Sequence, residues 1–120
     1  MIEEYKFGLI VIDGKTYNYD VEVRWNGEVL KWWRKEGHKI DVEDVKKAVE
    51  QSPDTIILGT GAYGVCKITE NCQNFIKEKG MKLIIDKTEE AVKTFNVILQ
   101  ESREEEGEQN KVIGLFHLTC

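Results

Sequence analysis

The sequence predicts an α/β protein, in which helices cover a largely parallel sheet and antiparallel hairpins near the N-terminus add strands or a layer beside it. Three observations lead to this fold class. Strand and helix patterns alternate from residue 55 to residue 118, and residues 16–25 alternate between polar and apolar side chains. Two turn dipeptides, Asp13–Gly14 and Asn26–Gly27, flank that alternating stretch. A β-α-β-α-β order favours right-handed crossovers between parallel strands.

The first third of the chain is expected to form an antiparallel meander. Residues 5–12 are expected as a first strand that is apolar on both faces, and Asp13–Gly14 can adopt the positive φ angles of a tight hairpin turn. In residues 16–25 the aromatic and valine side chains share one face and the polar side chains the other, which indicates a strand with one solvent-exposed face. Asn26–Gly27 then predicts a return strand over residues 28–33.

The first helix is expected to begin after Asp41, a residue that suits the N-cap position. The side chains of Val42, Val45, Ala48 and Val49 form one apolar stripe along it. Ser52–Pro53 ends the helix, because proline cannot continue the backbone hydrogen-bond ladder.

Strands and helices alternate in the rest of the chain. A strand over residues 55–59 is followed by a helix over 69–79, for which Thr69 is the expected cap and which Gly80 closes in a left-handed conformation. A strand over 81–85 comes next, and Thr88 is expected to cap the last helix, with acidic residues favourably placed in its first turn. Residues 112–118 form the final strand.

Composition predicts a single domain over residues 1–120, because a chain of 120 residues with 41% hydrophobic content and one proline fits one compact core. The formal net charge of -5 and the pI near 5.1 argue against nonspecific nucleic-acid binding, which needs clustered Lys and Arg. They also argue against binding to anionic membranes. The acidic segment 101–110 is interpreted as a solvated helix end and loop.

A cytoplasmic location is expected. The longest apolar runs, residues 9–12 and 56–58, are far shorter than the roughly 20 residues that cross a bilayer. Residues 1–4 lack the basic and apolar regions of a signal peptide. The three cysteines are odd in number and lack CxxC spacing, so reduced thiols are expected rather than a disulfide framework or a zinc knuckle. The sequence predicts no metal and no cofactor.

The segment Gly59–Gly64 places three glycines in a GxGxxG spacing directly after a buried strand. Such glycines let the backbone approach a phosphate closely, or merely let the chain turn. The carboxyl ends of parallel strands would bring this loop, residues 86–87 and residues 119–120 to one edge of the sheet. Asp86 also lies where a dinucleotide-binding unit keeps its ribose-binding acid. However, residues 65–68 separate the loop from the next helix, so a phosphate would lack the helix amides.

The second unusual segment is Trp32–His38. Adjacent residues of a strand point to opposite faces, so one tryptophan is expected in the core and the other near the surface. A partly exposed Trp beside Arg34 and His38 has the composition of an interaction hot spot. The packing alternative is that both rings cover sheet faces and Arg34 stacks on one of them.

His117 and Cys120 suggest a Cys–His nucleophile, because a histidine can deprotonate a thiol. Residues three apart on a strand face opposite sides, which argues against this pairing. His117 shares its face with Ile113 and Leu115, as expected of a packed and hydrogen-bonded histidine. A pairing of Cys120 with His38 remains an open alternative.

Taken together, Lys31–Arg34 with Gly37–His38, the strand and loop Ile57–Gly61, and the closing residues His117–Cys120 resemble the Mth-type domain family. That family includes the adipogenesis-associated Mth-domain proteins and mitochondrial complex I assembly factor 3. The resemblance runs over nearly the whole chain. It implies a three-layer α/β fold with a mixed, mostly parallel central sheet flanked by helices and an added N-terminal antiparallel β-hairpin layer.

The resemblance implies no established reaction, since the mitochondrial relatives act as assembly or regulatory proteins. No mitochondrial presequence is expected for this chain, so the partner of the mitochondrial relatives is not carried over. The matching residues define a candidate ligand or partner site: Trp32, Trp33, Arg34, His38, Gly59, Thr60, Gly61, Gly64 and His117.

The preferred hypothesis is a small non-enzymatic binding or assembly-type domain with a protein partner. The alternative is a small-molecule or anion-binding protein, or an enzyme, in which the Gly59–Gly64 loop and Arg34, His38 or Lys67 receive an anionic group. A concave pocket where loop amides and one of these cations converge would favour the alternative, and a filled loop would count against it.

Overall fold

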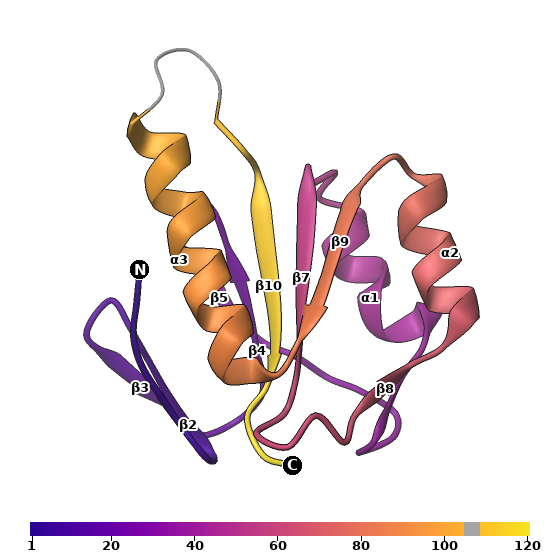
Figure 1. Ribbon diagram of the computed structural model, residues 1–120, viewed down its shortest axis with the longest axis horizontal. Coiled ribbons are helices and arrows are strands. Elements are labelled where there is room, and N and C mark those ends of the chain that lie inside the picture. Colours follow the sequence, from indigo (N-terminus) through magenta and orange to yellow (C-terminus); the bar gives the residue numbers. More distant parts are fainter. Residues whose placement is uncertain (105–108) are drawn as a thin grey trace.

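The computed structural model describes residues 1–104 and 109–120 and has three layers (Figure 1). The central layer is a five-stranded sheet with strand order β5-β4-β10-β7-β9. Its strands are β4 (Val21–Arg24), β5 (Val29–Lys31), β7 (Thr55–Thr60), β9 (Lys82–Asp86) and β10 (Val112–His117). Strands β10, β7 and β9 run parallel, whereas β4 is antiparallel to β10 and β5 is antiparallel to β4. The predicted α/β fold with a mixed sheet is confirmed.

The two outer layers cover opposite faces of this sheet (Figure 1). One face carries helix α3 (Thr88–Glu104) and a second sheet of order β1-β2-β3, and the other carries helices α1 and α2. The remaining elements are β1 (Ile2–Lys6), β2 (Leu9–Ile12), β3 (Lys15–Tyr17), β6 (Lys39–Ile40), α1 (Val42–Val49), β8 (Lys67–Ile68) and α2 (Glu70–Glu78). Strands β6 and β8 pair in parallel as a separate two-stranded sheet.

Alternation along the central strands divides the core into two clusters. Ile57 and Phe116 point toward α3, where the Phe116 ring meets Phe95 edge-on at 5.9 Å between centroids. Ile56 and Leu115 point to the opposite face, toward α1 and α2. Because side chains on strands alternate with period two, both faces of β7 and β10 are buried.

The first predicted strand is wrong in its bounds. Residues 5–12 are not one strand, because the chain reverses at Phe7 and Gly8 between β1 and β2. Gly8 has φ 77°, a left-handed conformation that glycine adopts without steric cost, so it serves as a turn residue rather than as part of a strand. The next turn is as predicted, since Asp13 and Gly14 have φ angles of 47° and 81°.

The alternating stretch 16–25 is not one strand with a wet face. It divides into β3 and β4, and the residues between them, which include Asp20, belong to neither strand. Glu22 and Arg24, which the alternation places in solvent, are buried, because β4 lies inside the central sheet with both faces covered. Arg24 Nε donates to Glu22 Oε2 at 2.7 Å, which pairs the two buried charges.

The predicted return strand over 28–33 is shorter than expected, since β5 ends at Lys31. Trp32 and Trp33 therefore follow the strand rather than belong to it.

Helix boundaries follow the predicted caps in two of three cases. Asp41 caps α1 in a capping box with Asp44, and Thr69 Oγ1 accepts from Cys72 N at the start of α2. Gly80 closes α2 with φ 79°. Thr88 does not have its predicted role as a cap, because it is the first residue of α3 and its hydroxyl contacts other segments.

Helix α3 includes the first residues of the acidic segment 101–110, as predicted, and residues 105–108 lie outside the described part of the chain. Within the described residues, none of the helices combines the length and the apolar character needed to cross a bilayer.

Candidate functional site

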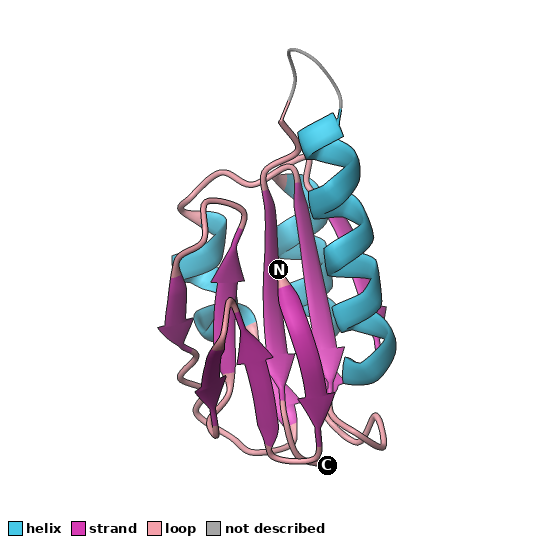
Figure 2. Cartoon of the chain, turned by 90° about the vertical axis from the view of Figure 1, so that its left-hand side faces the viewer, coloured by secondary structure: helices cyan, strands magenta, loops and turns pink. Residues whose placement is uncertain are grey.

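The carboxyl ends of the three parallel strands meet at one edge of the sheet, as the sequence predicts. Figure 2 shows this edge at the bottom of the molecule, where the chain end marked C also lies. Thr60 Oγ1 at the end of β7 donates to the carbonyl oxygen of Asp86 at the end of β9 at 3.1 Å. Thr88 Oγ1 donates to the carbonyl oxygen of His117 at the end of β10 at 2.6 Å and accepts from Gly61 N at 2.9 Å.

The Gly59–Gly64 loop is filled by the protein's own backbone. Ala62 N donates to the carbonyl oxygen of Thr119 at 2.6 Å, and Val65 N donates to that of Cys120 at 3.1 Å. A Cβ on Gly61, whose φ is 101°, would lie 2.5 Å from Cys120 O. The glycine therefore permits close approach of residues 119–120. Because these loop amides are already engaged, the arrangement counts against anion binding by the loop.

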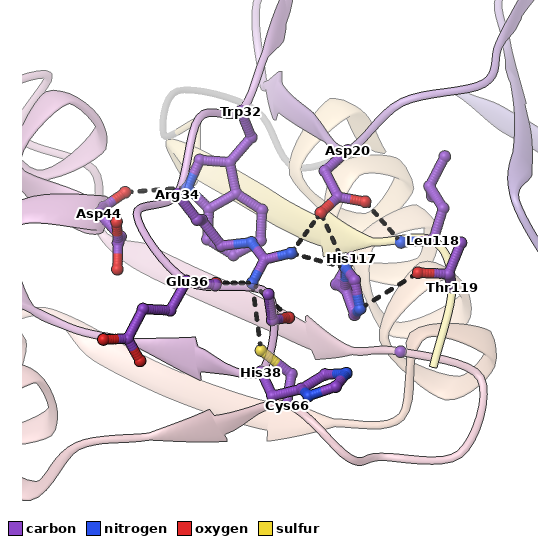
Figure 3. A network of polar contacts seen from close by, with 12 residues as sticks. Asp20, Trp32, Arg34, Glu36, His38, Asp44, Cys66, His117, Leu118 and Thr119 are labelled. Atoms are coloured by element: carbon purple, nitrogen blue, oxygen red, sulfur yellow. Dashed lines mark hydrogen bonds and ion pairs between the residues drawn. The ribbon is translucent and has the colours of Figure 1, made fainter.

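Arg34 lies at the centre of a polar network beside this edge (Figure 3). Its Nη2 atom donates to Asp20 Oδ2 at 2.6 Å, and its Nη1 atom donates to the carbonyl oxygens of Glu36 and Gly37, each at 3.0 Å. Nη1 also lies 3.4 Å from Cys66 Sγ. Since the side chain is 7% exposed, Arg34 acts inside the protein and is not the surface cation expected of a hot spot.

The guanidinium group of Arg34 also stacks on Trp32, with its Cζ atom 5.1 Å from the ring centroid. Arg34 Nε is buried and has no hydrogen-bond partner within the described residues. The electron-rich ring face attracts the cation and partly compensates for that missing acceptor. The stacking of Arg34 on a tryptophan is the packing alternative considered from the sequence.

His117 completes the network. Its Nδ1 atom lies 2.8 Å from both Asp20 Oδ2 and Arg34 Nη2. Arginine can only donate, so a neutral imidazole accepts from Arg34 when Nδ1 is unprotonated and donates to Asp20 when Nδ1 carries the proton. Asp20 Oδ1 accepts from Leu118 N at 2.8 Å. One carboxylate thus connects three chain segments: the one between β3 and β4, the one after β5, and the end of β10.

These contacts determine the protonation state of Asp20. Burial by itself opposes ionisation of the carboxyl group, but hydrogen bonds from His117, Arg34 and the Leu118 amide outweigh it and hold the pKa of Asp20 below its ordinary value. Asp20 is therefore the negative partner of Arg34 at neutral pH.

The two tryptophans lie in opposite environments, as expected. Trp32 is 6% exposed, and its Nε1 atom donates to the carbonyl oxygen of Asp44 at 2.9 Å. Trp33 is 75% exposed, and Lys31 Nζ lies 4.4 Å from its ring centroid. An open, shallow cavity of about 220 Å³ lies beside them, lined by Asp20, Lys31, Trp32, Trp33, Arg34, Glu36 and Gly37.

The candidate residues therefore divide into four groups. Trp32, Arg34 and His117 share the buried network, and the glycines with Thr60 form the adjacent filled loop. Trp33 lies exposed at the surface. His38 belongs to none of these three groups and lies on an exposed loop, with its Nε2 atom 3.9 Å from Cys120 Sγ. The histidine that contacts Cys120 is therefore His38, the alternative that the sequence left open. His117 pairs with Asp20 instead.

Sequence reasoning does not identify Asp20 and Cys66 as site residues. The alternation places Asp20 on the solvent face of an unbroken strand, although aspartate is disfavoured inside strands and is itself a signal for the break before β4. Cys66 carried no local signal, because its contact with Arg34 joins residues 32 positions apart.

A larger cavity, of about 660 Å³, lies elsewhere, between α1 and α2 at the amino ends of β7 and β9. Its lining includes Lys46, Phe75, Lys79 and Met81, and none of the predicted site residues.

Comparison with known proteins finds one matching family and several solved structures with a similar fold. The model of a family described as "Protein of unknown function (DUF498/DUF598)" matches residues 2–105. A conserved hypothetical protein from Pyrococcus horikoshii OT3 is similar in structure, with a TM-score of 0.85, 24% identity, and coverage of 100% of this chain and 99% of that one. The protein MT938 is also similar in structure, with a TM-score of 0.80, 24% identity, and coverage of 100% of this chain and 98% of that one.

A third structure is described as an outer membrane protein from Bartonella henselae, with a TM-score of 0.79, 20% identity, and coverage of 99% of this chain and 94% of that one. At these identities the likeness shows the fold alone.

Replacing Asp20 should destabilise the protein strongly. Asp20→Asn leaves the buried guanidinium of Arg34 without its charge partner, so we expect the free energy of unfolding in urea to fall by about 3 kcal/mol or more. Glu90→Gln is the control, because it breaks an exposed pair with Lys93 and should cost less than about 0.5 kcal/mol. Equal effects of the two variants would contradict a central role for Asp20.

The carboxyl group of Asp20 should also make the stability of the folded protein depend on pH. The pKa of Asp20 is lower in the folded than in the unfolded chain, so its contribution to stability is present above about pH 4 and disappears as pH falls through the folded-state pKa. Unfolding measured from neutral pH down to strong acid should show a smaller acid-dependent loss in Asp20→Asn than in the parent protein.

Gly61→Ala tests the contact between the loop and residues 119–120. Positive φ and the clash with Cys120 O should together lower the free energy of unfolding by about 2–3 kcal/mol. Gly80→Ala is the matched control, because Gly80 also has positive φ but open space around it, and should cost about 1 kcal/mol. If both variants lose the same stability, residues 119–120 do not pack on the loop.

Proposed function

We propose that this chain, which belongs to the DUF498/DUF598 family of proteins of unknown function, is a non-enzymatic binding or assembly-type domain with a protein partner. The observation that carries the proposal is the exposure of Trp33 on a rigid support. A tryptophan that is 75% exposed leaves a large apolar surface in water, and such side chains dominate the binding energy of protein interfaces.

Trp33 belongs to a small aromatic surface formed with Tyr19 and Lys31. Lys31 Nζ lies 4.4 Å from the Trp33 centroid and 5.2 Å from the Tyr19 centroid, so one cation contacts both rings. Tyr19 in turn packs edge-on against Tyr17, with ring centroids 5.9 Å apart. Strand β5, from which Lys31 comes, is the outermost strand on this side of the central sheet, which leaves the surface accessible.

The buried network supplies the rigidity that such a surface needs. Trp32 and Arg34 flank Trp33 in the sequence, and hydrogen bonds hold both of them. Trp32 donates to the carbonyl oxygen of Asp44, and Arg34 donates to the carboxylate of Asp20. A side chain that is already positioned loses little conformational entropy when a partner covers it. We therefore assign Arg34, His117 and Asp20 a positioning role, because Arg34 and His117 are each 7% exposed and their polar atoms face one another.

The family resemblance supports the assembly part of the proposal. The segments that resemble the Mth-type domain family include Trp32, Trp33 and Arg34, and the mitochondrial members of that family act as assembly or regulatory proteins. We place the domain in the cytoplasm as part of the same proposal. Anion binding by the Gly59–Gly64 loop has less support, since Ala62 N and Val65 N already donate to residues 119 and 120.

Trp33→Ala should weaken partner binding without affecting the fold. Truncating a central interface tryptophan costs about 2 kcal/mol or more, which is roughly 30-fold in affinity. Because Trp33 is mostly exposed, the melting temperature should change little. The measurement is quantitative mass spectrometry of proteins that co-purify with the tagged domain from cells of its source, followed by titration of the enriched partner.

Phe7→Ala is the control for this experiment. Phe7 is also an exposed aromatic residue, at 57%, but it lies on the turn between β1 and β2, where it contacts Tyr63. We expect it to retain the partner. An identical set of co-purifying proteins for the parent, Trp33→Ala and Phe7→Ala would rule the proposed surface out.

A further inference from the structure

The contact between His38 and Cys120 involves none of the residues of the proposed partner surface, Tyr19, Lys31 and Trp33. The two residues are 82 positions apart in the sequence, and the fold brings His38 Nε2 to 3.9 Å from Cys120 Sγ. His38 is exposed and Cys120 is half-buried, so solvent reaches the pair.

Backbone hydrogen bonds hold both residues on one short stretch of chain. Val65 N donates to the carbonyl oxygen of Cys120 at 3.1 Å, and Lys67 N donates to that of His38 at 2.9 Å. The backbones of Cys120 and His38 are therefore attached two residues apart, at Val65 just before β8 and at Lys67, the first residue of β8. This attachment brings the two backbones close together, within reach of a contact between their side chains.

The other two thiols differ from Cys120 in accessibility. Cys66 and Cys72 are buried, at 1% and 0% exposure. Burial raises the pKa of the Cys66 thiol above its ordinary value and that of Cys72 to about 12. Both thiols are thus kept protonated and away from solvent. A thiolate is the reactive form of cysteine, so these residues provide an internal reference for an unreactive thiol.

We propose that Cys120 is a modification site for small disulfides, with His38 accepting the thiol proton. The proton moves from Cys120 Sγ to His38 Nε2, and the thiolate attacks one sulfur of the disulfide. A new sulfur–sulfur bond forms between Cys120 and that sulfur as the original bond breaks. The leaving thiolate takes the proton from His38. Cys120 is oxidised to a mixed disulfide, the small disulfide is reduced to one thiol, and no further oxidant is needed.

The test follows the reaction of the full chain with dithiodipyridine, which releases a coloured thione for each thiol modified. We expect one rapid release per chain, assigned to Cys120 by peptide mass mapping and absent in Cys120→Ser. His38→Gln should lower the rate constant at neutral pH by about tenfold, because it removes the proton acceptor. Lys67→Gln is the matched control, since it removes an exposed cation from the same segment and should change the rate by less than about twofold.

Protection of Cys66 and Cys72 reports on folding in each variant, because release of more than one thione per chain marks an opened structure. A second measurement needs no variant: at neutral pH, folded Cys120 should react faster than free N-acetylcysteine despite being half-buried. An unchanged rate in folded His38→Gln, slower reaction than N-acetylcysteine, or first modification at Cys66 would each overturn the proposal.

Discussion

The buried ion pair between Asp20 and Arg34 is the interaction on which the rest of this end of the molecule depends. A guanidinium group that is 7% exposed is tolerated when its charge is neutralised and its terminal nitrogens donate hydrogen bonds. Asp20 Oδ2 supplies the charge at 2.6 Å, and the carbonyl oxygens of Glu36 and Gly37 satisfy the other terminal nitrogen. The loop after β5 therefore has to fold back over Arg34.

The same carboxylate connects this loop to the end of β10. Asp20 accepts from the Leu118 amide and contacts His117, so the chain between β3 and β4 has to pass beside the end of β10 at this point. This requirement gives a physical reason for the break in an otherwise regular alternation. It also explains why neighbouring tryptophans differ: Trp32 lies beneath Arg34 and donates to Asp44, while Trp33 extends into solvent over Lys31.

The glycine loop shows how one spacing can serve two purposes. A GxGxxG segment after a buried strand offers close approach and free amides, properties that suit a phosphate. In this fold the approaching group is the backbone of residues 119–120, to which Ala62 and Val65 donate. Residues 119–120 thus take the position that a ligand would have in the loop. The same contact places Cys120 beside His38.

The elements with local signals are predictable from the sequence: the α/β order, the Asp41 and Thr69 caps, the turn at Asp13–Gly14 and the end of α2 at Gly80. The burial of polar residues and the identity of their partners depend on the tertiary structure. Glu22 and Arg24 read as solvent-facing because alternation reports the two faces of a strand but not what covers each face. Likewise, the contacts of Asp20 with Arg34 and His117 join residues 14 and 97 positions apart, and no pattern of local spacing encodes such a pairing.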